Sequence, residues 1–185
     1  MSQPLSRLME AAHLPPTALC GAAPEAIPVS ALTADSRAVR PGTLFAALPG
    51  THADGRTFIP AAVQAGACAV LAPSGTMWPQ GTPPCPVVEC ENPRHALALM
   101  ATALAGPQPA HLAAITGTNG KTSTADFMRQ LWALQGFSAS AIGTLGLTGA
   151  NPTGLTLPPL TTPDPVTLAH TLATLEQAGV HHVAL

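Results

Sequence analysis

One short segment of the chain combines the residue types that hold phosphate groups. The apolar run 113–115 leads into Gly117-x-x-Gly120-Lys121-Thr122, and a helix-like pattern follows. Glycines let backbone N–H groups turn inward, and a helix N-terminus adds partial positive charge. Lys121 can reach the β- and γ-phosphates, and the Thr122 hydroxyl suits Mg²⁺. The segment therefore predicts a binding site for ATP or GTP.

Two alternatives to this phosphate loop follow from its spacing. The loop is shorter than G-x-x-x-x-G-K-[ST], because position 115 is Ile. A small-molecule kinase with a P-loop would need the full spacing. An ordinary strand-to-helix turn with an exposed lysine would need no ligand. The strand predicted before the loop and the helix predicted after it favour the phosphate site.

Composition restricts the class of protein. The chain has 185 residues, of which 46% are hydrophobic and 9% charged, and its net charge is −2. We expect one domain or two small ones, and no nucleic-acid partner, because no basic surface is indicated. Neither a signal peptide nor a stretch of membrane-spanning length is visible, so we expect a cytoplasmic protein without membrane insertion.

Cysteine and histidine spacing does not indicate a metal site. The four cysteines show no metal-type pairing, and we interpret them as buried, reduced thiols. His181-His182 lies on a predicted strand, where neighbouring side chains point to opposite faces. We therefore expect one of these two imidazoles to point inward and the other outward. The cysteines are Cys20, Cys68, Cys85 and Cys90.

Strands alternate with helices along the first half of the chain. Apolar runs at 43–48, 68–72 and 86–90 predict strands, and helical spacing at 5–14 and 58–65 predicts helices. Asn92 and Pro93 form a cap and first turn for a helix that reaches about residue 104. This rhythm predicts an α/β fold with a mainly parallel sheet.

The segment Gly106-Pro107-Gln108-Pro109 predicts a domain boundary, with one domain at 1–106 and a second at 110–185. Beyond it, strands are expected at 111–116, 138–142 and 180–185. A helix over 122–135 would place Ala125, Met128, Leu131, Trp132 and Gln135 along one side. Asp164-Pro165 predicts the start of another helix, which runs through residue 178.

Five stretches, taken together and in order, resemble the Mur ligases, the ATP-dependent enzymes that add amino acids to the peptidoglycan precursor. The resemblance spans nearly the whole chain and is greatest to the branch that adds the third amino acid. It implies a small Rossmann-like N-terminal domain that binds the uridine nucleotide, followed by the first part of a central ATPase domain of P-loop type. The stretches are T-G-T-N-G-K-T-S-T, Asp35-Ser36-Arg37 with Pro41-Gly42-Thr43-Leu44-Phe45, 50–59, Ile142-Gly143-Thr144-Leu145-Gly146 and Thr161-Thr162-Pro163-Asp164-Pro165.

The resemblance implies a reaction and its participants. ATP, with Mg²⁺, would phosphorylate the carboxylate of UDP-MurNAc-L-Ala-D-Glu. The amino group of diaminopimelate or lysine would then attack the acyl phosphate, because phosphorylation supplies the leaving group that a carboxylate lacks. The family also implies a monomer and a role in cell wall synthesis.

The resemblance also implies roles for particular residues. Lys121 would be the catalytic residue, Thr122 the Mg²⁺ ligand, and Ser36 a contact of the uridine diphosphate. Leu160 replaces the more polar residue that the family often has before its threonine pair. The ATP phosphates would be held by Gly117, Thr118, Asn119, Gly120, Lys121, Thr122 and Ser123. The uracil pocket would be lined by Thr51, His52 and Ala53, and the muramyl group contacted by Thr161 and Thr162.

Other interpretations of these residues stay open. Ser36 could cap a turn between Asp35 and Arg37, and Thr161-Thr162 could be plain loop residues. His52 could be an exposed loop residue. Arg37 and Arg56 could contact phosphate or form surface ion pairs, so neither is assigned to the site.

The resemblance further implies that the chain covers less than half of a family member. A Glu-x-Ser-Ser segment, whose Glu supports magnesium in the family, has no counterpart after Val180–Leu185. We therefore expect binding without ligation, and we expect 110–185 to be less well held than 1–105. The alternatives are another Mur-type ligase, a relative of folylpolyglutamate synthetase, or a non-catalytic remnant that binds a nucleotide.

Overall fold

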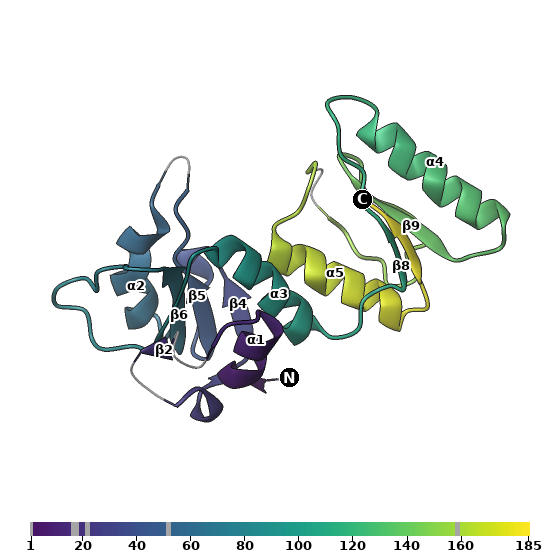
Figure 1. Cartoon of the computed structure of the whole chain (residues 1–185). Helices are drawn as coiled ribbons and strands as arrows, with labels where there is room; N and C mark the ends of the chain where they lie inside the picture. The colour runs from purple at the N-terminus through teal and green to yellow at the C-terminus, as the bar shows by residue number, and fades with distance from the viewer. Residues whose placement is uncertain (1, 16–18, 21–22, 51–52, 158–159) are drawn as a thin grey trace. The chain divides into compact units, whose positions relative to one another are not determined.

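The computed structural model describes residues 2–15, 19–20, 23–50, 53–157 and 160–185, and divides them into two compact units, Met1–Leu104 and Ala105–Leu185 (Figure 1). Each unit contains a mainly parallel sheet, which confirms the predicted α/β class. No helix in these ranges is both long enough and apolar enough to cross a membrane.

Unit 1 is built on a five-stranded sheet with the order β2-β7-β6-β5-β4. Strands β4 to β7 are parallel, and β2 pairs antiparallel with β7. A separate short antiparallel pair joins β1 and β3. The strands are β1 (Gln3–Pro4), β2 (Leu19–Cys20), β3 (Pro28–Val29), β4 (Ala31–Thr33), β5 (Thr43–Ala46), β6 (Ala69–Pro73) and β7 (Val87–Cys90).

Helices cover this sheet, and large apolar side chains fill the space between the layers. Strand β5 is buried at every position, as is typical of a central parallel strand. Asn92 accepts a hydrogen bond from the His95 backbone N–H at 3.1 Å, so the predicted cap of α3 is confirmed. The helical segments are α1 (Leu5–Ala11), η2 (Pro24–Ala26), η3 (Ser36–Ala38), η4 (Gly55–Phe58), α2 (Ile59–Gln64) and α3 (Pro93–Ala105).

Unit 2 contains a four-stranded sheet with the order β10-β9-β11-β8. Strand β11 runs parallel to both β8 and β9, whereas β10 returns antiparallel beside β9. The β9–β10 hairpin was not predicted from the sequence. The elements are β8 (His111–Ala113), α4 (Lys121–Leu134), β9 (Ala139–Gly143), β10 (Gly146–Gly149), α5 (Pro165–Gln177) and β11 (His182–Ala184).

The two helices of unit 2 pack on clusters of different size. Buried Leu172 and Leu175 of α5 pack with Ile142, Val180 and Val183. The cluster under α4 is formed by three alanines, with Met128 and Trp132 only partly buried against it. The backbone N–H groups of Val166 and Thr167 donate to the Asp164 carboxylate at 3.1 Å, which confirms the predicted cap of α5.

The residues predicted to lie along one side of α4 are not equally buried. Leu131 is 55% exposed and Gln135 is also exposed, whereas Ala125 is buried and Met128 and Trp132 are partly buried. Each residue turns an α-helix by about 100°, so Leu131 lies about 60° from Met128 and further still from Ala125. A side chain that far from the helix–sheet contact is exposed to solvent.

The adjacent histidines at the start of β11 have different surroundings. The ring of His182 stacks on those of His111 and Phe137, with centroid distances of 4.3 and 4.4 Å. His181 is exposed and its Nδ1 lies 2.7 Å from the Glu176 carboxylate. The prediction that one imidazole points inward and one outward is therefore confirmed.

Candidate nucleotide and substrate site

The phosphate loop of unit 2 connects β8 to α4. Gly120 is the N-cap residue of α4 and has a φ of 79°, a left-handed conformation that costs glycine little. The Gly120 carbonyl accepts the first helical hydrogen bond, from the Thr124 N–H at 2.8 Å. Helix α4 therefore begins at Lys121, and its N-terminal N–H groups point toward the loop.

The loop presents donors that are not used within the chain. Among the described residues, no acceptor is recorded for the backbone N–H groups of Thr118, Asn119 and Gly120. These residues are exposed, and a Cβ built on Gly120 would meet nothing within 4 Å. Unpaired N–H groups at the start of a 14-residue helix form an environment suited to an anion.

Lys121 is the sole lysine of the chain. Its ammonium group donates to the backbone carbonyls of Gly117 and Thr118, at 2.5 and 3.4 Å. The side chain therefore folds over the loop, at the place where a phosphate held by the N–H groups would need a counter-charge. A phosphate group could replace these carbonyls as the acceptor.

A cavity of about 160 Å³ brings the loop together with three further segments. Lys121 and Thr122 line one part of it, and another is lined by Gly143, the last residue of β9, and by Thr144, which follows it. Thr161 and Thr162, which precede α5, complete it together with Leu185, after β11. Strands β8, β9 and β11 are parallel, so the cavity lies at the carboxyl edge of the sheet, where α/β proteins bind ligands.

Thr144 is a site residue that the sequence analysis did not identify. Its Oγ1 lies 2.8 Å from the Oγ1 of Thr122, so the two hydroxyls are hydrogen-bonded. The sequence feature that could have identified it is a threonine that follows a glycine at the carboxyl end of a predicted strand, because such strand ends lie near the phosphate loop. The contact fixes the hydroxyl that is predicted to bind Mg²⁺.

The predicted substrate contacts of unit 1 lie on one edge of its sheet. Ser36 follows β4 and is half-buried, whereas Ala53 follows β5 and is exposed. Both follow the carboxyl ends of neighbouring parallel strands, the expected ligand-binding edge. Thr51 and His52 lie outside the described residues.

Two arginines at this edge pair with aspartates. The Arg37 guanidinium and backbone N–H both donate to Asp35, and these bonds lower the pKa of the Asp35 carboxyl to about 2. Arg56 and Asp54 repeat the arrangement one strand away. Each aspartate caps a short 3₁₀ segment, and each Asp-x-Arg turn is overall neutral because the two side chains form an ion pair.

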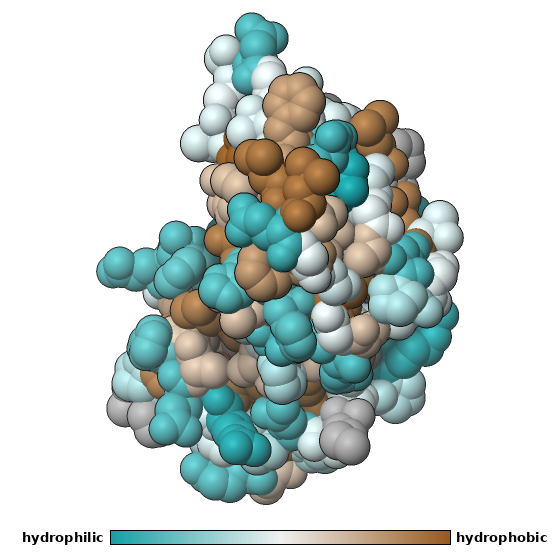
Figure 2. All heavy atoms as spheres, turned by 90° about the vertical axis from the view of Figure 1, so that its right-hand side faces the viewer, coloured by the Kyte–Doolittle hydropathy of each residue, from teal (hydrophilic) through white to brown (hydrophobic). Residues whose placement is uncertain are grey.

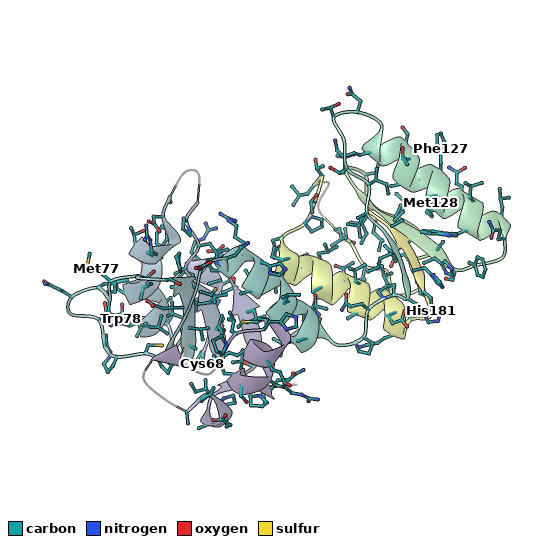
Figure 3. All side chains as sticks on the ribbon, in the orientation of Figure 1. Cys68, Met77, Trp78, Phe127, Met128 and His181 are labelled. Carbon is teal, nitrogen blue, oxygen red and sulfur yellow. The ribbon has the colours of Figure 1, made fainter. Side chains whose placement is uncertain are left out.

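Metal-binding clusters of side chains are not found among the described residues: no three His, Cys, Asp or Glu side chains are grouped to hold an ion. The cysteines whose side chains are described, Cys68, Cys85 and Cys90, are free, and burial raises the pKa of each thiol, that of Cys85 to about 11. Figure 3 shows Cys68 within unit 1. A cation at the phosphate loop would therefore be held by hydroxyl groups and phosphate oxygens, the hard ligands that Mg²⁺ takes.

The fold and the loop are those of an α/β protein with a phosphate-loop motif between a strand and a helix. Comparison with known families gives a more specific assignment: residues 28–105 match the Mur ligase family, catalytic domain, and residues 115–185 match the Mur ligase middle domain. The chain belongs to the Mur ligase family.

Known relatives point to one branch of this family. The chain is 49% identical over 161 residues to a UDP-N-acetylmuramoyl-L-alanyl-D-glutamate–2,6-diaminopimelate ligase of Caulobacter vibrioides, and 46% identical over 159 residues to the ligase of the same name from Rhizobium meliloti. These matches cover 85% and 86% of the chain but 32% of each relative. The chain therefore spans about a third of the length of these relatives.

A solved structure agrees with this assignment. The structure of a UDP-N-acetylmuramoyl-L-alanyl-D-glutamate–2,6-diaminopimelate ligase superposes with a TM-score of 0.75 at 25% identity. The match covers the whole chain and 36% of that structure. Both units therefore have counterparts in a single solved protein.

Proposed function

We propose that the chain forms the uridine-nucleotide domain and the first part of the ATP-binding domain of a ligase. The ligase adds 2,6-diaminopimelate to UDP-MurNAc-L-Ala-D-Glu. The main structural support is the cavity that groups Lys121 and Thr122 with Thr161 and Thr162. These four residues line the same cavity, and this supports a scheme in which the ATP phosphates and the substrate lie close enough for transfer of a phosphoryl group.

The choice of diaminopimelate rests on the printed names of the relatives. The choice of ATP rests on the phosphate loop and on the family. In the proposed reaction, an oxygen of the peptide carboxylate attacks the γ-phosphorus and ADP leaves. The amine of diaminopimelate then attacks the acyl carbon, and phosphate leaves as the amide forms.

Each loop residue has a role in this scheme. The N–H groups of 118–120 and of the first turn of α4 would hold the phosphates, and Lys121 would neutralise charge on the γ-phosphoryl group. Bound Mg²⁺ would supply further charge neutralisation between the phosphates. Thr122 would provide its ligand, with the hydroxyl oriented by Thr144. In unit 1, Ser36 and 51–53 would bind the uridine diphosphate.

Lys121 allows a direct test of ATP binding. Because it is the sole lysine, an amine-reactive reagent modifies only this side chain and the N-terminus. We expect Mg-ATP to slow modification of Lys121, read by peptide mass spectrometry, while the N-terminus reacts unchanged. Lys121→Ala should weaken ATP binding by roughly 10- to 100-fold, as expected for loss of a charge-assisted hydrogen bond. Arg7→Ala serves as a control with the same loss of one positive charge.

Substrate binding is measured separately by calorimetry. We expect UDP-MurNAc-L-Ala-D-Glu to bind the chain and Ser36→Ala to weaken it, with ATP binding unchanged. If neither ligand binds, the proposal is wrong. If ATP binds and the uridine nucleotide does not, a nucleotide-binding remnant or a folate-type relative is the better description. We expect no phosphate release by the 185-residue chain alone, because it spans a third of its relatives.

A further inference from the structure

Two cysteines of unit 1 precede neighbouring parallel strands in the same register. Val70 of β6 pairs with Val87 of β7, and the Val70 N–H donates to the Pro86 carbonyl at 2.8 Å. Cys68 and Cys85 each stand two residues before this pair, so the same register places them opposite each other. Proline favours an extended conformation in the residue before it, which suits Cys85 to this position.

A contact of the Cys85 thiol supports this placement. Its Sγ donates to the Ala67 carbonyl at 3.5 Å, and that carbonyl belongs to the peptide bond between Ala67 and Cys68. Facing residues on neighbouring strands have Cα atoms about 4.8 Å apart, within the range of about 4.4–6.8 Å that a disulfide spans. Both cysteines are free and half-buried, and Figure 3 shows Cys68 inside unit 1. The two thiols can therefore be joined with little movement of the backbone.

The surroundings of the two thiols affect their reactivity. Burial raises the pKa of both, that of Cys85 to about 11 with a smaller contribution from the charge of Cys68. The reduced pair therefore lacks the stabilised thiolate that makes some protein disulfides easy to reduce. The same burial slows oxidation at neutral pH, because the thiolate is the attacking species.

We propose that Cys68 and Cys85 form a redox-active dithiol, which closes to a disulfide at the amino ends of β6 and β7. The oxidant is a low-molecular-weight disulfide. The thiolate of one cysteine attacks a sulfur of this reagent, which forms a mixed disulfide and releases one reagent thiolate. The thiolate of the second cysteine attacks the protein sulfur of the mixed disulfide and releases the second reagent thiolate. The protein gives up two protons and two electrons, and the reagent is reduced to two thiols.

The disulfide closes residues 69–84, which contain β6 and most of the connection to β7, into a loop. Trp78 on this connection packs against the same core cluster as Cys85, and its Nε1 donates to the Thr82 carbonyl at 3.2 Å. A closed loop restricts the unfolded chain, so the oxidised form should unfold at a temperature at least about 5 °C higher. The pair lies at the amino ends of its strands, opposite the proposed ligand-binding edge, so the inference does not depend on ATP or on the uridine nucleotide.

The other two cysteines provide a control and a competitor. Cys90 is the last residue of β7, five residues after Cys85. That separation is about 16 Å along a strand, beyond the reach of a disulfide, so Cys90 should remain a free thiol. Cys20 on β2 pairs through its backbone with Val87, beside the same strand. A disulfide that includes Cys20 is therefore the product that the test must distinguish.

A disulfide between two chains is a further competing product. Phe127, Leu131 and Leu134 of α4 are 62%, 55% and 85% exposed. Figure 2 shows hydrophobic residues gathered in the upper part of the molecule, at the height of α4 in Figure 1. Exposed apolar surface of this kind promotes association of chains. Oxidation is therefore measured at several protein concentrations, because an intermolecular bond depends on concentration and an intramolecular bond does not.

Equilibration with reduced and oxidised glutathione tests the pair. The 185-residue chain is equilibrated at about pH 8, both folded and in concentrated urea. Free thiols are then blocked with iodoacetamide, and disulfides are mapped by mass spectrometry of unreduced peptides. We expect a bond between Cys68 and Cys85, with Cys90 blocked as a free thiol. The equilibrium constant for this bond should be at least about tenfold larger in the folded chain than in urea, because the fold holds the two thiols together.

Three single variants complete the test. Cys68→Ser and Cys85→Ser should each lose the bond and the rise in unfolding temperature on oxidation. Cys90→Ser, the matched control, should keep both. The measurement on the unmodified sequence does not depend on the folding of any variant.

Four outcomes overturn the proposal. They are a bond that includes Cys20 or Cys90, a bond that appears only as the protein concentration rises, an equilibrium constant no larger in the folded chain than in urea, and a folded chain in which Cys68 and Cys85 stay free at every glutathione ratio.

Discussion

The two units differ in how completely they bury their own apolar side chains. Among the described residues, eleven of the twelve largest fully buried side chains belong to unit 1, and the twelfth is Leu175 of unit 2. Seven of the nine large apolar side chains that the structure shows as exposed belong to unit 2. Both units are built on a mainly parallel sheet, so they differ in how fully their apolar side chains are covered and not in architecture.

This contrast suggests a division of roles. Unit 1 has the layers and the packing of a domain that folds alone. Unit 2 has the predicted phosphate loop, formed by local sequence, on a sheet whose edge strand β8 pairs only with β11 among the described residues.

The largest expected effect compares two phenylalanines. Phe45 on β5 is fully buried, whereas Phe127 on α4 is largely exposed. Phe45→Ala should lower the free energy of unfolding of unit 1 by about 3–5 kcal/mol, because it removes apolar contact and leaves a cavity. Phe127→Ala should change stability by less than about 0.5 kcal/mol in the isolated chain. Urea denaturation measures both. Equal costs would contradict the contrast between the units.

The second prediction compares hydrogen exchange in the two sheets. Amides of β9 and β11 should exchange at least about tenfold faster than those of β5 and β6, a difference of about 1.4 kcal/mol in the free energy of opening. The reason is the small cluster under α4 and the open edge of β8. Exchange followed by mass spectrometry gives the result. Equal protection in both sheets would show that unit 2 is held as well as unit 1.

A smaller effect is expected at the hydroxyl pair of the phosphate loop. Thr144→Val removes the hydrogen bond to Thr122 and should weaken Mg-ATP binding by about 2- to 10-fold, the worth of one hydrogen bond of about 0.5–1.5 kcal/mol. Thr144→Ser should retain the wild-type affinity, because it keeps the hydroxyl. Binding of ATP without Mg²⁺ should change less than binding with it. A serine variant as weak as the valine variant would assign Thr144 a packing role.

The smallest effect is a difference in pH dependence. Burial, with smaller contributions from the charges of His111 and His181, lowers the pKa of His182 below its ordinary 6.5. Protonation therefore favours the unfolded state. The contribution of His182 to the stability of unit 2 is complete above about pH 6.5 and is lost as the pH falls below that value.

Unit 1 should respond only at lower pH. The hydrogen bonds from Arg37 lower the pKa of Asp35 from 3.8 to about 2, so this stabilisation is present above pH 3.8 and is lost as the pH falls toward 2. We therefore expect amides of unit 2, but not of unit 1, to lose protection as the pH first falls below about 6.5. His182→Phe keeps an aromatic ring between His111 and Phe137 and should abolish that loss. An unchanged pH dependence in this variant would exclude His182 as its source.

Features that depend on local sequence were predicted well. The strand, loop and helix around 113–135 follow from an apolar run, two glycines and a helical pattern. The caps at Asn92 and Asp164 follow from a side chain that bonds to N–H groups two or three residues away. Each of these interactions joins residues that are close in the sequence, so local sequence nearly determines them.

Features that depend on distant residues were not predictable in this way. The hydrogen bond between Thr122 and Thr144 joins residues from two elements, and the β9–β10 hairpin places both Thr144 and Gly149. The cavity needs four segments to converge at one edge of the sheet. The sequence shows each of these residues but not which of them meet.

Helix α4 has features of both kinds, some determined by local sequence and some by residues distant in the sequence. Its sequence determines that the helix forms, begins at the phosphate loop and has apolar residues along much of its circumference. Whether Leu131 is buried is decided by which strands lie beneath the helix and by what covers its flank. Periodicity gives the direction of a side chain relative to its own helix, whereas burial is a property of everything packed around it.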